Sequence, residues 1–122
     1  MLDHVTIGVS DIKRSIQFYD RALLPLGIAR LYGDGNRFAG YGIRPKAFFW
    51  IGIRNAQQSG AHIAFAANDR ATVDRFYDAA IAAGGKDNGR PGIRAHYDPD
   101  YYGAFVLDPD GHNIEAVCRL PE

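Results

Sequence analysis

The chain repeats one pattern of residues at an offset of 58 positions (62 − 4 = 58). The pattern begins as His4-Val-Thr-Ile-Gly-Val-Ser-Asp11 and returns as His62-Ile-Ala-Phe-Ala-Ala-Asn-Asp69. The same offset aligns Phe18-Tyr19-Asp20 with Phe76-Tyr77-Asp78, Ala22 with Ala80, and Gly27 with Gly85. A register that is kept through a strand, a helix cap and a helix indicates two copies of one supersecondary unit.

Each copy is predicted to begin with a strand and to continue with a helix. The first strand, residues 2–9, has Val5, Ile7 and Val9 on one face and Leu2, His4 and Thr6 on the other. Asp11 and Asp69 are favourable N-caps, so we expect helices from Asp11 to about Leu24 and from Asp69 to about Ala83. The expected core-facing residues are Phe18, Tyr19, Ala22 and Leu23 in the first helix and Val73, Phe76, Tyr77, Ala80 and Ile81 in the second.

Short strands and turns are expected in the remainder of each copy. In the first copy the strands are predicted near residues 28–32, 37–42 and 47–53. A polar linker over residues 55–60 separates the copies, and residues 89–99 are expected to form a polar loop. Two strands, at residues 101–107 and 112–119, end the second copy.

The last two strands are joined by Asp108-Pro109-Asp110-Gly111, a sequence typical of a tight turn. Alternation along the final strand puts Ile114, Ala116 and Cys118 on one face and Asn113, Glu115 and Val117 on the other. Glu115 therefore interrupts an apolar strand. Its carboxylate either lies on a solvated sheet face or is held by a metal or a cation, because an unpaired buried charge is very costly.

His4 and His62 occupy matching places in the two copies, and small residues share their strand faces. If the copies associate about a pseudo-twofold axis, the two imidazoles face each other across a concave surface, and Glu115 points the same way if its sheet face is the concave one. Two imidazoles and one carboxylate form the facial ligand set of a divalent metal, with positions left for water or substrate. The alternative is that each histidine is a polar residue on a half-wet sheet. His96 and His112 lack such partners and are expected at the surface, with His96 able to line a pocket mouth.

Composition excludes several classes of partner. Lys plus Arg and Asp plus Glu are 14 each, so a net charge of zero suggests neither nucleic-acid binding nor a polybasic membrane anchor. No apolar run approaches the roughly 20 residues that span a bilayer. A single cysteine, Cys118, and a start without signal-peptide character favour a reducing cytoplasm, and we expect a small-molecule ligand.

Three stretches make the chain resemble the vicinal oxygen chelate superfamily, which includes glyoxalase I, extradiol dioxygenases, fosfomycin-resistance transferases and bleomycin-resistance proteins. They are His4-Val-Thr-Ile with Phe18-Tyr19 and Leu23, His62-Ile-Ala-Phe, and Asp108-Pro-Asp-Gly-His-Asn-Ile-Glu115. The resemblance implies an α+β fold, a single domain over residues 1–122. Two βαβββ modules, residues 1–57 and 58–122, would form a curved mixed sheet with helices on the outer face and a concave metal site.

By this resemblance His4, His62 and Glu115 fall on the metal positions of the family, for a divalent ion such as Fe, Mn, Zn or Ni. Glyoxalase I carries a further glutamate, and aligning Phe48-Phe-Trp-Ile with Asn113-Ile-Glu-Ala puts Trp50 in its place. The resemblance then favours a metal-dependent enzyme of the lyase, isomerase or dioxygenase class acting on a small oxygenated substrate. The alternative is a non-catalytic small-molecule binding or drug-sequestration protein of the bleomycin-resistance type.

Side chains beside the metal are expected to contact the ligand. The candidates are Phe38, Trp50, Tyr101, Tyr102 and Arg94, for which core packing or solvated loop charges are the alternatives. Catalytic residues are not assigned. In the family the modules pair within one chain or between two, and the short linker favours an exchanged homodimer in which His4 comes from one chain and His62 with Glu115 from the other.

Overall fold

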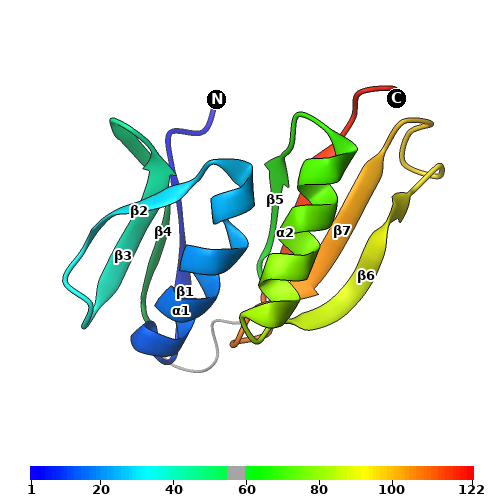
Figure 1. The fold of residues 1–122 in the computed structure, drawn as a ribbon. Helices are drawn as coiled ribbons and strands as arrows, with labels where there is room; N and C mark the ends of the chain where they lie inside the picture. The colour runs from blue at the N-terminus through cyan, green and yellow to red at the C-terminus, as the bar shows by residue number, and fades with distance from the viewer. Residues whose placement is uncertain (55–59) are drawn as a thin grey trace.

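The computed structural model of the protein describes residues 1–54 and 60–122, and the chain forms two modules of the same design (Figure 1). The first contains β1 (Val5–Val9), α1 (Ile12–Ala22), a short 3-10 helix (Leu24–Leu26), β2 (Ala29–Gly33), β3 (Phe38–Ile43) and β4 (Lys46–Ile53). The second contains β5 (His62–Ala66), α2 (Arg70–Ala82), β6 (Lys86–Ile93), β7 (Tyr102–Leu107) and β8 (Asn113–Cys118). This order confirms the α+β fold of two βαβββ modules.

Each module has its own four-stranded mixed sheet, so the predicted curved sheet is made of two separate parts. The strand orders are β1-β4-β3-β2 and β5-β8-β7-β6. In both sheets the first strand runs parallel to the last, and the remaining neighbours are antiparallel. The strands β1 and β5 are the sheet edges that face the other module (Figure 1).

The two helices begin where the sequence predicts. The carboxylates of Asp11 and Asp69 accept hydrogen bonds from the amides of Arg14 and Thr72, at 3.2 and 2.7 Å. These bonds satisfy amides that a helix leaves unpaired at its first turn. Of the expected core-facing residues, Ile81 is exposed and Tyr77 only partly buried, and the others are buried. Neither helix in the described part of the chain is long and apolar enough to cross a membrane.

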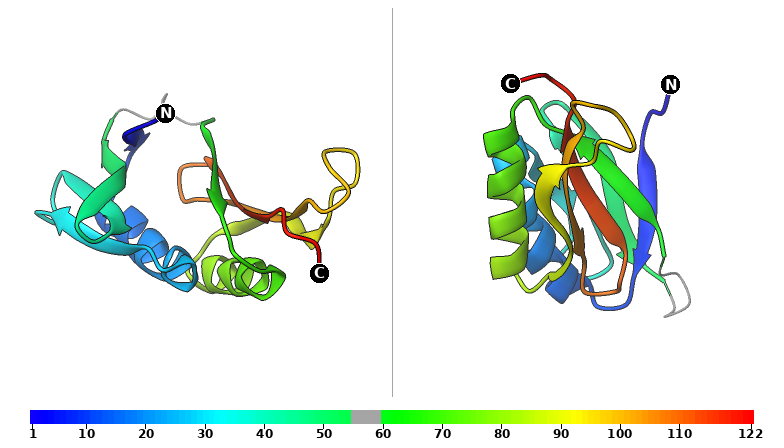
Figure 2. Two further views of the ribbon diagram at one scale, coloured as in Figure 1. Left: turned by 90° about the horizontal axis from the view of Figure 1, so that it is seen from above. Right: turned by 90° about the vertical axis from the view of Figure 1, so that its right-hand side faces the viewer.

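Both helices lie on the same side of the sheets, and the opposite sheet faces are left open (Figure 2). One hydrophobic core runs through both modules between helices and sheets. At the junction the rings of Phe49 and Phe65 meet edge to face, with centroids 5.3 Å apart. The open faces are therefore held in place by a shared core behind them.

The turn between β7 and β8 fastens the second module to the first. The Asp110 carboxylate accepts from the Ser10 amide at 3.0 Å, and the buried Tyr19 hydroxyl donates to Asp108. His112, predicted at the surface, is fully buried here. Its Nδ1 accepts from the amide of Ala61 at 3.1 Å, so Nε2 carries the proton and donates to the carbonyl of Gly8 at 2.7 Å. The surface prediction was wrong because this turn packs against another module rather than against water.

A second prediction also needs correction. Residues 89–99 were expected to form a polar loop, but residues 86–93 form β6, which pairs with β7. Its register shifts between Asp87 and Gly89 and again between Gly89 and Gly92, and these irregularities accommodate the glycines. Pro91 is tolerated because β6 is an edge strand, and the outer side of an edge strand has no neighbour that needs an amide donor. The predicted linker at 55–60 and the module boundary at 57/58 lie mainly outside the described residues.

Candidate functional site

His62 and Glu115 are brought together on the open face of the second sheet. Their strands are parallel neighbours, with Ala64 paired to Glu115. The His62 Nε2 lies 2.8 Å from the Glu115 Oε1. Glu115 is 1% exposed, whereas the His62 side chain is 53% exposed. The carboxyl group is thus buried and held by partners, and is not a solvated residue.

Tyr101 holds the other oxygen of the same carboxylate. Its hydroxyl donates to the Glu115 Oε2, and burial, reinforced by this bond, raises the pKa of Tyr101 to about 12. The phenol therefore remains a donor throughout the neutral range. Gly103 lies directly beneath, where a Cβ atom would come within 3.2 Å of the Tyr101 ring and 3.4 Å of Oε2. The close packing fixes the direction of the carboxylate.

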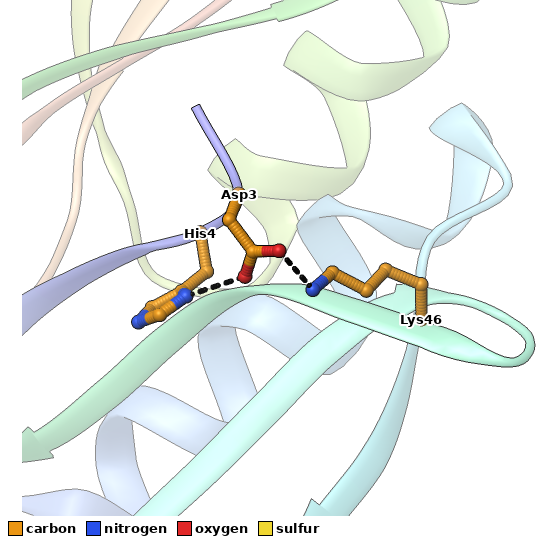
Figure 3. Close-up of polar contacts among 3 residues, drawn as sticks. All are labelled: Asp3, His4 and Lys46. Carbon is orange, nitrogen blue, oxygen red and sulfur yellow. Dashed lines mark hydrogen bonds and ion pairs between the residues drawn. The ribbon is translucent and has the colours of Figure 1, made fainter. Parts of the chain in front are cut away.

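His4 lies on the other module, just before β1. Its Nδ1 is 2.7 Å from the Asp3 Oδ1, and the Asp3 Oδ2 is 2.7 Å from the Nζ of Lys46 (Figure 3). Hydrogen bonds from Lys46 and then from His4 lower the pKa of Asp3. Because an ionised Asp3 can only accept, Nδ1 of a neutral His4 carries the proton. In Figure 3 the Nε2 atom of His4 points away from Asp3. Its lone pair is then available to a ligand.

The three predicted metal ligands do not meet within one chain. Among residues 1–54 and 60–122, no group of three His, Cys, Asp or Glu side chains is placed to hold a metal ion. His4 and His62 both border a cavity of about 560 Å³ between β1 and β5, but Glu115 does not. The structure therefore joins two of the three residues and leaves His4 with Asp3.

A larger cavity, of about 800 Å³, lies on the open face of the first sheet. Trp50 and Phe38 line it together with His4, Arg37 and Arg54. Thr6 pairs with Trp50 just as Ala64 pairs with Glu115. Since Thr6 and Ala64 are related by the 58-residue repeat, the indole of Trp50 stands where the second module has its carboxylate.

A third cavity, of about 430 Å³, lies on the open face of the second sheet beside His62. Arg94 and His96 line it, and Phe105 forms part of its wall. The Arg94 guanidinium is 5.3 Å from the Phe105 ring centroid and donates to the carbonyls of Gly92 and Arg90, at 2.8 and 2.7 Å. Arg94 therefore lies beside His62 with its donors partly used by the backbone, and its contact with a ligand stays a prediction.

Tyr102, the remaining predicted ligand contact, faces the opposite way. Its hydroxyl donates to the Asp74 carboxylate of α2 at 2.6 Å, and Arg70 covers its ring at 5.2 Å. The bond to Asp74, together with burial, raises the pKa of Tyr102 to about 12. Alternation along β7 turns Tyr102 toward the helix, so it is not part of the open face.

Two residues near the candidate ligands were missed in the sequence. Asp3 orients His4, and the acid directly before the histidine was a signal for it. Tyr97, which is exposed and lines the cavity beside His62, lies in a segment whose sequence shows no periodic pattern. Its position depends on the course of the chain between β6 and β7.

A family model described as the Glyoxalase/Bleomycin resistance protein/Dioxygenase superfamily matches residues 1–116. The chain belongs to this superfamily. Members of the superfamily bind small molecules, usually bind a divalent metal and often dimerise. No curated protein matches the chain.

Several solved structures of the superfamily share the fold. A glyoxalase/bleomycin resistance protein from Albidiferax ferrireducens T118 is 33% identical, with a TM-score of 0.80, over 98% of this chain and 99% of that one. A fosfomycin resistance protein from Mesorhizobium loti is 21% identical, with a TM-score of 0.70, over 97% and 91%. A glyoxalase-related enzyme from Fulvimarina pelagi is 19% identical, with a TM-score of 0.73, over 97% and 87%. The latter two establish likeness of fold alone.

Proposed function

We propose that the protein is a divalent-metal-dependent enzyme of the lyase, isomerase or dioxygenase class, acting on a small oxygenated substrate. His4, His62 and Glu115 would be the protein ligands of the metal. The observation that carries the proposal is the contact between His62 and the buried Glu115, at 2.8 Å. The imidazole is half-exposed, the carboxylate is buried, and their sheet face borders a cavity. Histidine and glutamate in such a pair are common metal ligands.

The donor atoms suit an ion such as Fe, Mn, Zn or Ni. Two imidazole nitrogens and one carboxylate oxygen form a set that binds these ions and leaves positions for water or substrate. Donors bound side by side at about 2.1 Å are about 3 Å apart, close to the separation of His62 and Glu115. Asp3 and Tyr101 would orient His4 and Glu115 from behind, as outer partners of metal ligands commonly do.

A metal bound there would act as a Lewis acid that polarises a substrate oxygen. The chain itself contributes binding and orientation around that oxygen. Trp50 stands at the place equivalent to Glu115 and has no acid or base group, so it supplies neither a fourth ligand nor a proton acceptor. Glyoxalase I chemistry, which the resemblance associates with a fourth carboxylate, is therefore disfavoured.

Each complete site would be shared between two copies of the chain. His4 and the pair of His62 with Glu115 lie on different modules, and the described residues of one chain hold no three-ligand group. The open face of the first module in one copy would cover the open face of the second module in its partner. We accordingly propose a homodimer with two sites.

Metal analysis tests the proposal directly. The purified protein is stripped with a chelator, reloaded with each ion in turn and assayed for bound metal by elemental analysis. His4→Ala, His62→Ala and Glu115→Ala should each weaken binding greatly, whereas Asp78→Ala, which removes an exposed carboxylate of α2 on the helix side, should not. Substoichiometric metal that cannot be reloaded into the wild-type protein would refute the enzyme proposal.

Mixed dimers test the shared site. His4→Ala and Glu115→Ala variants are unfolded, mixed and refolded together. In a mixed dimer with shared sites, one site regains all three ligands and the other loses two, so metal binding should return in part. If mixed dimers form but bind no more tightly than either variant alone, each site takes its ligands from one chain.

Non-catalytic binding is the second candidate function. The open aromatic face around Trp50 and Phe38 favours it, because such a surface can hold an organic ligand without a metal. The same metal analysis separates the two candidates, since a sequestration protein should bind its ligand and yet take up no stoichiometric metal on reloading. A cytoplasmic location remains a prediction from the sequence.

A further inference from the structure

Three aromatic side chains form a platform on the open face of the first sheet: Tyr32, Phe38 and Trp50. The Tyr32 and Trp50 rings are stacked, with centroids 5.8 Å apart and planes 12° apart. Phe38 lies 6.2 Å from Trp50 on a tilted plane. Tyr32 is 52% and Phe38 41% exposed, although aromatic rings of this size are normally buried in a core. Exposed apolar surface gathered in one place commonly marks a binding site.

Gly40 builds this platform into the sheet. It pairs with Tyr32 on one side and with Trp50 on the other, so the three residues form one row across β2, β3 and β4. A Cβ atom on Gly40 would lie 2.6 Å from the indole ring. The missing side chain lets the indole lie directly on the backbone of β3. The orientation of the platform is therefore fixed by the sheet and does not depend on a ligand.

Positive charge borders the platform. Arg37 and Arg54 line the same cavity. None of the ion pairs in the described part of the chain involves Arg37 or Arg54. The one acid close by in sequence, Asp34, accepts the backbone amides of Asn36 and Arg37. A guanidinium presents a planar fork of donors that fits a carboxylate better than it fits a neutral group.

We propose that this platform binds a planar aromatic ring that carries a carboxylate. The ring packs on Trp50 and Phe38, and the carboxylate pairs with Arg37 and Arg54. The cavity of about 800 Å³ lies in the range of small-molecule sites and accommodates one or two fused rings. The inference names the substrate class of the proposed enzyme and rests on that proposal for turnover. The binding itself needs no metal, because its contacts are the aromatic rings and the two guanidinium groups.

The single tryptophan of the chain makes the test direct, because fluorescence excited in tryptophan comes from Trp50 alone. Chelator-treated protein is titrated with benzoate, benzamide and cyclohexanecarboxylate. Benzoate should change the emission in a saturable way. Benzamide should bind about ten-fold more weakly for lack of the charge-assisted bonds. Cyclohexanecarboxylate should also bind more weakly, because it lacks the flat ring.

Variants assign the contacts. Arg37→Gln and Arg54→Gln should each reduce the affinity for benzoate but not for benzamide, and Arg75→Gln, on the far side of the second module, is the matched control. Gly40→Ala should displace the indole and weaken both ligands. Trp50→Leu should abolish binding. Calorimetry measures binding to this variant, because its fluorophore is lost. Circular dichroism of each variant checks that the fold is kept.

His62→Ala separates this inference from the metal proposal, since it should lose metal and still bind benzoate. Equal affinities for benzoate and benzamide would overturn the inference, as would unchanged benzoate binding in both arginine variants. Emission that stays unchanged on addition of benzoate would also overturn it, because no ring would then pack on Trp50.

Discussion

Replacing His112 by alanine should destabilise the protein strongly, although the residue is far from any proposed ligand. The imidazole is fully buried and connects the β7–β8 turn to Gly8 in β1 and to Ala61 before β5. His112→Ala removes both hydrogen bonds, at about 1 kcal/mol each. It also leaves a cavity where the ring was, at about 2 kcal/mol. We expect the free energy of unfolding to fall by about 4 kcal/mol.

Urea unfolding of metal-free protein, followed by circular dichroism, measures this loss. At a slope of about 2 kcal/mol per molar urea, the midpoint should move down by about 2 M. His112→Asn is the informative partner variant. Its Oδ1 takes the place of Nδ1 and still accepts from Ala61, while the bond to Gly8 is lost, so the loss should be intermediate. His96→Ala, in an exposed loop, should leave the midpoint unchanged.

The reasoning is refuted if His112→Ala unfolds within about 1 kcal/mol of the wild-type protein, because two lost bonds and a cavity exceed that value. It is also refuted if His112→Asn is as unstable as His112→Ala. In that case the bond to Ala61 contributes nothing.

Three further variants test single contacts by the same unfolding measurement. Tyr101→Phe should lose about 2 kcal/mol at neutral pH, because the Glu115 carboxylate loses its donor in a buried place. Tyr19→Phe should lose a similar amount, since the buried Tyr19 hydroxyl donates to Asp108. Asp69→Ala should lose about 1 kcal/mol with the N-cap of α2. An unchanged stability of Tyr101→Phe would show that Glu115 is held without Tyr101. An unchanged stability of Tyr19→Phe would show the same for Asp108 and Tyr19. An unchanged stability of Asp69→Ala would show that the cap of α2 is dispensable.

The contribution of Tyr101 should also depend on pH. Its folded pKa, about 12, is above its ordinary value of 10.0. The folded state therefore favours the protonated phenol, and the stabilisation is fully present below pH 10 and is lost as the pH rises through 12. The difference in stability between wild type and Tyr101→Phe should be constant from neutral pH to about pH 10 and should shrink above it. A difference that grows with pH in this range contradicts the assignment.

The repeated pattern was enough to predict the order of elements in each module. Helix caps and apolar periodicity are local signals, so Asp11, Asp69 and the buried stripe of α1 were identified without a structure. Alternation along the last strand was enough to place Glu115 on the face opposite Ile114 and Ala116. The equivalence of Trp50 and Glu115 followed from aligning the two copies, and the strand register supports it.

Features that depend on contacts between distant segments were not predictable. The pattern of β6, rich in glycine and with Pro91, lacks strand character, and only pairing with β7 makes it a strand. His112 was expected at the surface because its partners, Gly8 and Ala61, are 104 and 51 residues away. Tyr102 is a different case, because both neighbouring tyrosines were assigned to the open face although alternation puts only one of them there.

The sequence by itself thus determined the two modules, their helices and the chemistry of the candidate ligands, because these depend on residue type and on spacing within one element. The tertiary structure decided which of those residues meet. His62 and Glu115 meet because β5 and β8 are parallel neighbours, whereas His4 lies on another sheet. Packing through the helices and the β7–β8 turn leaves both sheet faces open, and no local pattern in the chain encodes that arrangement.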